Sequence, residues 1–196
     1  TAASLRSCCS KKKYWSKRFT NWLKSIELTT ESAKLTLEEH LETAQMLRKK
    51  QYLINKQIRK LAEKENYKEN YTLLLSVPGI GSLTAMLILT ELGDIKRFKN
   101  LDNLCSFIGL IPMTNSTGDD EKIGEITVRR NEILRTAIIE SSWIAIKNDP
   151  ALMLAYQKLV KRMKPQKAII RIAKKLVNRI MYVLNNKQAY VQAVVK

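Results

Sequence analysis

A mainly α-helical fold is predicted by three features of this 196-residue sequence. Only 6 Gly and 4 Pro interrupt the chain. The long stretches between them are rich in Leu, Lys, Glu, Ile and Ala, which are compatible with helix. Hydrophobic residues make up 45% of the sequence, which is enough for a packed core. We therefore expect an elongated helical, coiled-coil arm followed by a compact helical domain that contains a helix-hairpin-helix motif.

The arm is predicted to begin with a basic amphipathic helix over residues 11–27. Lysines and Arg18 alternate there with apolar side chains at helical spacing. These apolar positions are Tyr14, Trp15, Phe19, Trp22, Leu23 and Ile26. The aromatic members could stack on bases, but we favour packing against another helix, which is the commoner use of such a stripe.

A second arm helix is predicted from Thr36 to about Lys64, after a break near residues 28–36. Apolar positions recur in it at alternating three- and four-residue steps, as in a coiled-coil seam. They are Leu37, Leu41, Ala44, Leu47, Ile54, Ile58 and Leu61, with Gln51 in the same register. Such a narrow stripe must be buried against another helix, so we expect pairing with residues 11–27 or a homo-oligomer.

Residues 65–71 are polar and are predicted to be a linker. The chain is accordingly divided into a helical coiled-coil arm, residues 1–65, and a C-terminal domain, residues 66–196.

The segment 73–93 is predicted to be the helix-hairpin-helix. A first apolar helix ends at Val77, because a proline restrains the residue before it. Two glycines then permit a tight turn, and the second helix, Ser82 to Leu92, starts with unpaired N–H groups that suit a phosphate. The candidate DNA-binding residues are Pro78, Gly79, Ile80, Gly81 and Ser82. The alternative is a tight turn between two helices with no ligand.

Three more helices are predicted at the C-terminal end of the chain. Thr127 is expected to cap a helix that runs to about Lys147, and Pro150 to start the next one. The last helix, from Lys167 to about Asn185, has one apolar face and one basic strip. The strip is expected to contact a phosphate backbone through Arg171, Lys174, Lys175 and Arg179.

The charge of the chain points to a polyanionic partner. There are 35 Lys and Arg against 18 Asp and Glu, which gives a formal net charge of +17. Residues 1–24 hold seven basic residues and residues 150–196 hold eleven, with no acidic residue in either stretch. A nucleic acid is therefore the expected partner, although basic helix faces can also be merely solvated.

Several other classes of protein are disfavoured. The three cysteines, at positions 8, 9 and 105, lack the spacing of a zinc site, and the only histidine, His40, leaves little for a His-based site. The sequence has neither a signal peptide nor the roughly 18 uninterrupted apolar residues of a membrane-spanning helix. A cytoplasmic location and no membrane partner are expected.

A series of short motifs after the predicted hairpin resembles a known family. The motifs are Gly93-Asp94-Ile95, Arg97-Phe98, Leu104 to Pro112, Asn115 to Gly118, Gly124 to Arg130, Leu134-Arg135 and Lys167 to Arg179. In this order and spacing, residues 73–184 resemble the transposase domain of the insertion-sequence 110/116/902 family, relatives of the Piv-type DNA invertases. The preceding arm looks like the coiled-coil linker of that family.

The resemblance implies an active site made of two parts. In full-length members a RuvC-like domain supplies four acidic residues that hold Mg²⁺, and the domain seen here supplies a serine that becomes covalently linked to DNA. On this interpretation the RuvC-like domain would precede Thr1. Some members are guided by an RNA, so a guide RNA joins double-stranded DNA among the implied partners.

The nucleophile falls in residues 115–118, which we predict to be a loop. The register of the family points to Thr117, whereas the primary hydroxyl of Ser116 is the less crowded one; both are candidates, with Ser116 slightly favoured. Arg129 and Arg130, and further on Arg135, are expected to neutralise phosphate charge. Without the resemblance, an ordinary Ser/Thr-Gly turn would be the favoured interpretation of this segment.

The acidic run at residues 119–121 is interpreted as a solvated turn, because consecutive carboxylates cannot all converge on one ion. No metal site is therefore predicted in this chain, and Mg²⁺ is expected only through the RuvC-like domain.

The sequence thus predicts the DNA-binding and strand-exchange part of a transposase or site-specific recombinase. By itself this chain is expected to bind nucleic acid and to be inactive. The alternatives are a non-catalytic helix-hairpin-helix module that binds nucleic acid, and a helical oligomerisation protein whose charge is incidental.

Overall fold

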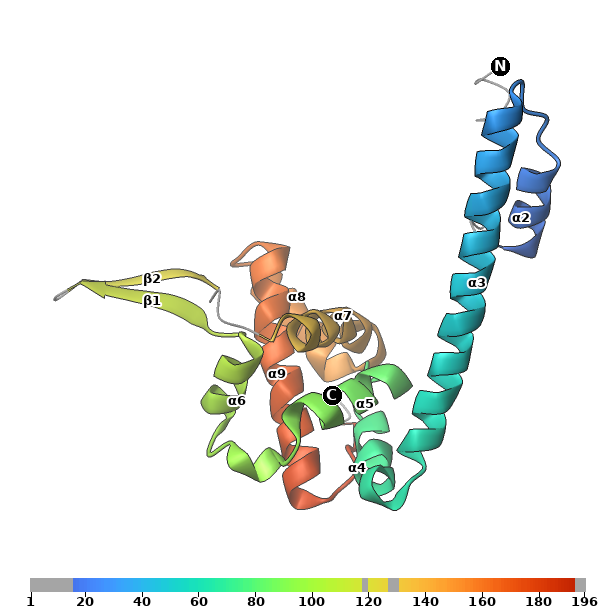
Figure 1. Ribbon diagram of the computed structural model, residues 1–196. Helices are drawn as coiled ribbons and strands as arrows, with labels where there is room; N and C mark the ends of the chain where they lie inside the picture. The colour runs from blue at the N-terminus through green and yellow to red at the C-terminus, as the bar shows by residue number, and fades with distance from the viewer. Residues whose placement is uncertain (1–15, 118–119, 127–130, 193–196) are drawn as a thin grey trace. The chain divides into compact units, whose positions relative to one another are not determined.

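The computed structural model describes residues 16–117, 120–126 and 131–192 (Figure 1). The protein is mainly α-helical, as predicted. No helix of the described part is long and apolar enough to cross a membrane. Contacts divide the chain into two compact units, residues 1–56 and 57–196. The long helix α3, Glu31–Ala62, runs through this division, and the predicted boundary after residue 65 stays a prediction.

In the first unit, the short helix α2, Lys17–Lys24, packs against the first half of α3 (Figure 1). Ser16 caps α2, because its hydroxyl accepts a hydrogen bond of 3.2 Å from the N–H of Phe19. Phe19 and Leu41 are buried. The aromatic stripe therefore serves packing at Phe19, while the part of the predicted helix before Ser16 lies outside the described residues.

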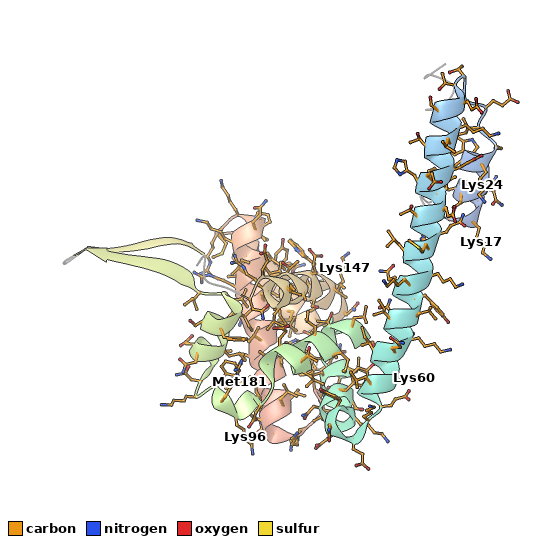
Figure 2. The ribbon with its side chains drawn as sticks, viewed as in Figure 1. Lys17, Lys24, Lys60, Lys96, Lys147 and Met181 are labelled. Carbon is orange, nitrogen blue, oxygen red and sulfur yellow. The ribbon has the colours of Figure 1, made fainter. Side chains whose placement is uncertain are left out.

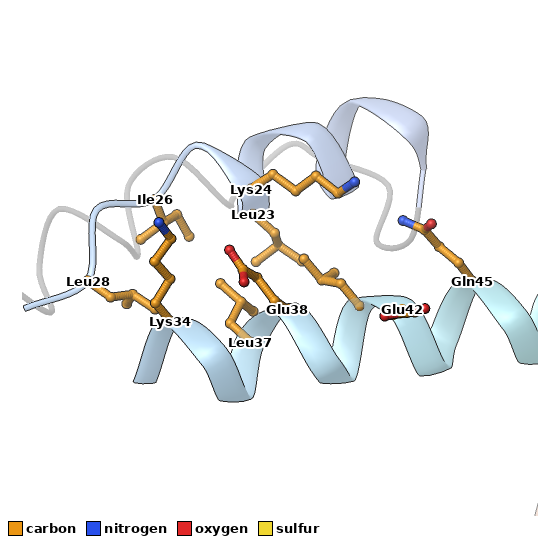
Figure 3. Close-up of a pocket in the computed structure, with 10 residues that line it drawn as sticks. Leu23, Lys24, Ile26, Leu28, Lys34, Leu37, Glu38, Glu42 and Gln45 are labelled. Atoms are coloured by element: carbon orange, nitrogen blue, oxygen red, sulfur yellow. The ribbon is translucent and has the colours of Figure 1, made fainter. Parts of the chain in front are cut away.

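A hollow of about 470 Å³ lies between α2 and α3 (Figure 3). Its lining combines apolar and charged side chains, namely Leu23, Lys24, Ile26, Leu28, Lys34, Leu37, Glu38, Leu41, Glu42 and Gln45. The N-terminal part of the predicted seam, with Leu37 and Leu41, thus pairs with a helix of the same chain. Further along α3 the seam is open, since Leu47 is 56% exposed and Ile54 is 45% exposed.

The second unit is built around α9, Pro165–Asn186. Its neighbours are α4 (Glu65–Leu75), the short 3₁₀ helix η1 (Ile95–Arg97), α6 (Leu101–Ile108), α7 (Glu132–Asn148) and α8 (Pro150–Val160). The apolar face of α9 supplies the largest group of buried side chains, namely Ala168, Ile169, Ile172, Ala173, Leu176, Val177, Ile180, Val183 and Leu184. The apolar periodicity of this helix is what places it at the centre of the core.

The predicted linker at residues 65–71 is wrong, because this stretch forms most of α4. Tyr67, Tyr71 and Leu74 lie three or four residues apart and pack against the core from one face of the helix. The Tyr71 hydroxyl also donates a hydrogen bond of 2.8 Å to Ser82 Oγ. The polar residues between the tyrosines conceal this face in the sequence.

The predicted loop at residues 115–118 is also wrong over residues 115–117. The strands β1, Pro112–Thr117, and β2, Asp120–Ile126, pair antiparallel and lie side by side in Figure 1. Thr114, Thr117, Ile123 and Ile126 are β-branched, which favours strand over loop. Residues 118–119, between the strands, lie outside the described part of the chain, and residue 118 is the last residue of the predicted loop.

The start of α7 differs from the prediction as well. Thr127 lies outside the described residues, and α7 begins at Glu132. Its cap is Asn131, whose side-chain oxygen accepts a hydrogen bond of 3.0 Å from the Leu134 N–H. The same side chain donates a hydrogen bond of 2.5 Å to Glu91 of α5, Ser82–Leu92, which ties the end of α5 to the start of α7. The predicted starts of α5 and α8, at Ser82 and Pro150, agree with the structure.

Candidate nucleic-acid interface

The turn between α4 and α5 is fixed to the core on one side. Val77 and Ile80 are buried, and Gly79 has a φ of +90°. A Cβ at Gly79 would meet the carbonyl oxygen of Ser141 and would lie 2.9 Å from Ala145. Gly79 is therefore required both by its backbone angle and by the close approach of α7.

The other side of this turn faces outward. Gly81 is the N-cap of α5, and a Cβ there would have no atom within 4 Å. No side chain of the described residues caps this helix, and the Ser82 hydroxyl is engaged by Tyr71. The first N–H groups of α5 therefore retain their hydrogen-bonding capacity for a ligand.

Among the predicted residues of this turn, Ile80 is used differently from the rest. Its side chain is 6% exposed and belongs to the core cluster. The residue can contribute only its backbone to an interface. Pro78 and Ser82 are half-buried, and Gly81 is exposed.

The basic face of α9 consists of Arg171, Lys174 and Lys175. Arg171 and Lys175 are exposed. Lys174 forms an ion pair of 2.7 Å with Asp102 of α6, in which both side chains retain substantial exposure. The hydrogen bond to Asp102 raises the pKa of Lys174, so it remains charged.

Arg179, also predicted to bind DNA, lies in an interior ion-pair cluster with Asp149 and Tyr190. Its guanidinium is 2.7 Å from Asp149 Oδ2 and 4.7 Å from the centroid of the Tyr190 ring. The Tyr190 hydroxyl donates to the same carboxylate at 2.9 Å. The structure thus pairs Arg179 with groups of the same chain, and its predicted contact with DNA stays a prediction.

The cluster also fixes the start of α8. Asp149 Oδ1 accepts a hydrogen bond of 2.9 Å from the Leu152 N–H, as an N-cap does. Burial by itself would raise the pKa of Asp149, but the hydrogen bonds from Leu152, Arg179 and Tyr190 outweigh it and lower that pKa. Burial, together with the bond to Asp149, raises the pKa of Tyr190.

The burial of Arg179 has a signal in the sequence that the charge pattern conceals. Arg179 follows the fully buried Ile172 by seven residues and Leu176 by three, which places it on the edge of the apolar face. Its partner Asp149 lies 30 residues away in the sequence, so the contact itself could not be predicted from spacing.

The two predicted nucleophiles lie near the tip of the β-hairpin. In the backbone register, Ser116 is opposite Glu121 and Thr117 is opposite Asp120. Arg135 is half-buried in α7 and makes further interactions. Arg129 and Arg130 lie outside the described residues.

Metal-ligating side chains do not gather in the part of the chain whose side chains the structure describes. Within residues 16–112 and 131–192, no group of three or more His, Cys, Asp or Glu is placed to hold an ion.

Comparison with known proteins shows a family similarity over part of the chain. Residues 71–157 match the family described as "Transposase IS116/IS110/IS902 family". This match includes the turn between α4 and α5, the β-hairpin and most of α8. Residues 71–157 of the chain belong to that family.

Individual proteins encoded by insertion sequences show the same similarity. The chain is 30% identical over 119 residues to the transposase for insertion sequence element IS1111A of Coxiella burnetii, covering 59% of this chain and 33% of that protein. It is 36% identical over 67 residues to the transposase for IS1328 of Yersinia enterocolitica, covering 34% of this chain and 20% of that protein. An insertion element IS110 protein of 43.6 kDa from Streptomyces coelicolor is 31% identical over 119 residues, which cover 60% of this chain and 29% of that protein. The chain thus spans a third or less of the length of these relatives.

Proposed function

We propose that this chain is the DNA-binding and strand-exchange part of an insertion-sequence transposase. The observation that carries the proposal is the family match over residues 71–157, which covers both the outward-facing start of α5 and the strand with Ser116 and Thr117. The net charge of +17 supports DNA as the partner.

In this proposal the α4–α5 turn holds the DNA backbone. A phosphate would accept hydrogen bonds from the first N–H groups of α5, at the positive end of the helix dipole. Gly79 keeps the turn against α7, and Gly81 leaves room on the outer side. These backbone contacts read no sequence, so they would position the DNA without selecting it.

A hydroxyl of β1 then acts on the DNA strand. The oxygen of Ser116 or Thr117 would form a bond to phosphorus while one ester bond from that phosphorus to a sugar oxygen breaks. The hydroxyl proton goes to a general base, and the departing sugar oxygen receives a proton from a general acid. The DNA is then covalently attached to the protein. Only one of the two hydroxyls is expected to react, since a single bond to phosphorus accounts for one covalent attachment.

Other parts of the proposal rest on the resemblance. A RuvC-like domain would supply the carboxylates that bind Mg²⁺, whose role would be to stabilise charge on the reacting phosphate. A guide RNA would direct the choice of target. The exposed part of the α3 seam would form a homo-oligomer.

The proposal is tested with Ser116→Ala and Thr117→Val in the full-length protein that contains this chain. Each variant is incubated with duplex DNA carrying an end of the element, and the covalent adduct is measured on a denaturing gel. We expect one variant to abolish the adduct while DNA binding is retained, and the matched control Ser106→Ala, an exposed serine of α6, to form it normally.

Two other outcomes would count against the proposal. If a variant that combines Ser116→Ala with Thr117→Val still forms the adduct, the nucleophile lies elsewhere. If the wild-type protein binds DNA but forms no adduct with any end sequence, the chain is a non-catalytic nucleic-acid-binding module.

A further inference from the structure

Arg97 is held against two aromatic rings at the surface of the second unit. It ends η1, and its guanidinium carbon lies 4.6 Å from the centroid of Phe98 and 4.7 Å from that of Phe107. The two rings are 5.4 Å apart and tilted by 56°. Both phenylalanines are half-buried and Arg97 is exposed. We call these three residues the arginine platform.

The platform restrains the guanidinium and leaves its donors available. Contact with the rings limits the orientations of the side chain through cation–π attraction, while the N–H groups at its edge stay hydrated. The two acidic residues closest in sequence have other partners, since Asp94 accepts from the Lys96 N–H at 2.9 Å and Asp102 pairs with Lys174. No carboxylate of the described residues forms an ion pair with Arg97.

The surroundings of the platform are basic. Lys96 and Lys99 on either side of it are exposed, and Lys96 is labelled at the edge of the second unit in Figure 2. Both η1 and α6 pack against α9. Lys174 of α9 is bound to Asp102 of α6, the helix that carries Phe107 of the platform.

We propose that the arginine platform is a second phosphate-binding point, for the backbone of duplex DNA. A guanidinium presents a planar fork of donors that matches two phosphate oxygens, and a fork that is already oriented loses less entropy on binding. The inference rests on the proposed function, because it assigns a further contact to the same DNA.

The platform is separate from the α4–α5 turn. The turn precedes α5 and η1 follows it, so the two points lie at opposite ends of an 11-residue helix. At about 1.5 Å per residue this helix is roughly 16 Å long, too long for both points to hold one phosphate. The duplex is therefore held at two places along α5.

The test uses Arg97→Ala and Arg97→Lys in the full-length protein, with fluorescence anisotropy on labelled duplex DNA over a salt series. For Arg97→Ala we expect roughly tenfold weaker binding, as for removal of a hydrogen bond to a charged group. The slope of log K against log salt should fall by about one unit, because one phosphate is no longer neutralised. Arg97→Lys keeps the charge but not the fork, so its affinity should stay several-fold below wild type.

Two further variants separate the platform from general charge and from folding. Arg59→Ala removes the same charge from an exposed position of α3 and should change the affinity much less than Arg97→Ala. Phe107→Leu removes one of the two supporting rings and should weaken binding by a smaller factor than Arg97→Ala. The thermal midpoint of each variant, measured in parallel, should match wild type for the arginine variants.

Several results would overturn the inference. The first is an affinity of Arg97→Ala for duplex DNA within twofold of wild type, with an unchanged salt slope. The second is an affinity of Arg97→Lys equal to that of wild type. The third is an affinity of Arg59→Ala as low as that of Arg97→Ala. A parallel series with structured RNA adds another, since loss of RNA affinity alone would exclude duplex DNA as the ligand. Failure of wild type to bind DNA would overturn the proposed function as well, whereas normal binding and adduct formation by Arg97→Ala would overturn only the platform.

Discussion

Basic residues of α9 lie in two regions that the charge pattern does not distinguish. Arg171 and Lys175 are exposed on the outer face, whereas the side chain of Arg179 is only 17% exposed and is bound to a carboxylate that is 1% exposed. The turn between α4 and α5 has the same division, with Gly79 packed on α7 and Gly81 open. Neighbouring residues of one type thus divide into some that hold the fold together and others that are available to a ligand.

The largest expected effect comes from breaking the interior cluster. Arg179→Ala leaves the buried Asp149 without its cation, and loss of one partner of a buried pair costs about 3–5 kcal/mol. Urea unfolding followed by circular dichroism measures this loss in the free energy of unfolding. The matched control Arg171→Ala should change it by less than about 0.5 kcal/mol. Equal stabilities of the two variants would remove the distinction between the regions.

The two glycines of the turn give the next largest contrast. Gly79→Ala should destabilise the protein by at least about 1–2 kcal/mol, because the positive φ is unfavourable for alanine and the new methyl meets α7. Gly81→Ala has negative φ and open space, so its unfolding free energy should stay the same or rise slightly. The thermal midpoints of the two variants measure this, and a destabilised Gly81→Ala would contradict the described turn.

The sequence was sufficient for those elements whose apolar pattern is continuous. The starts of α5 and α8, and the position of α9, follow from prolines, glycines and a periodic apolar face. It was insufficient for α4, where two tyrosines among polar residues form the buried face. The β-hairpin was missed because Asn, Ser and Thr favour turns as readily as strands when no neighbouring strand is known.

The candidate site was predictable only in part, for a related reason. Sequence spacing places Ser82 at a helix start and Arg171 on an outer face. It cannot join residues that are distant in the chain, such as Arg179 with Asp149. The arginine platform was missed for the same cause, since Arg97 and Phe98 meet Phe107 only after α6 folds back on η1.

A pH dependence should distinguish the interior cluster further. The pKa of Asp149 in the folded protein is below its ordinary value of 3.8. The folded state therefore binds its proton more weakly than the unfolded state, and the ionised carboxylate stabilises the fold above that ordinary value. This contribution should decline as the pH falls below about 4 and through the lower folded pKa.

The variant Asp149→Asn removes the titration. The difference in thermal midpoint between wild type and Asp149→Asn should be constant from neutral pH to about pH 5 and should narrow below about pH 4. A difference that is independent of pH down to about 2 would show that the charge of Asp149 contributes nothing to stability.

The smallest expected effect on stability comes from the exposed face of α9, which carries Arg171 and Lys175. Substitutions there are expected to change DNA binding instead. Arg171→Ala combined with Lys175→Ala should leave the unfolding free energy within about 0.5 kcal/mol of wild type. The salt slope of DNA binding should fall by about two units, one for each phosphate that is no longer neutralised. An unchanged slope would assign these residues to the solvated surface.

The identity of the residue that becomes linked to DNA tests the central claim most directly. The wild-type full-length protein would be reacted with an element-end duplex, digested with protease and nuclease, and the DNA-bearing peptide identified by mass spectrometry. We predict that the modified residue is Ser116 or Thr117, in the peptide that contains β1. A modified residue outside β1, or no covalent peptide despite DNA binding, would contradict the assignment of strand exchange to this part of the chain.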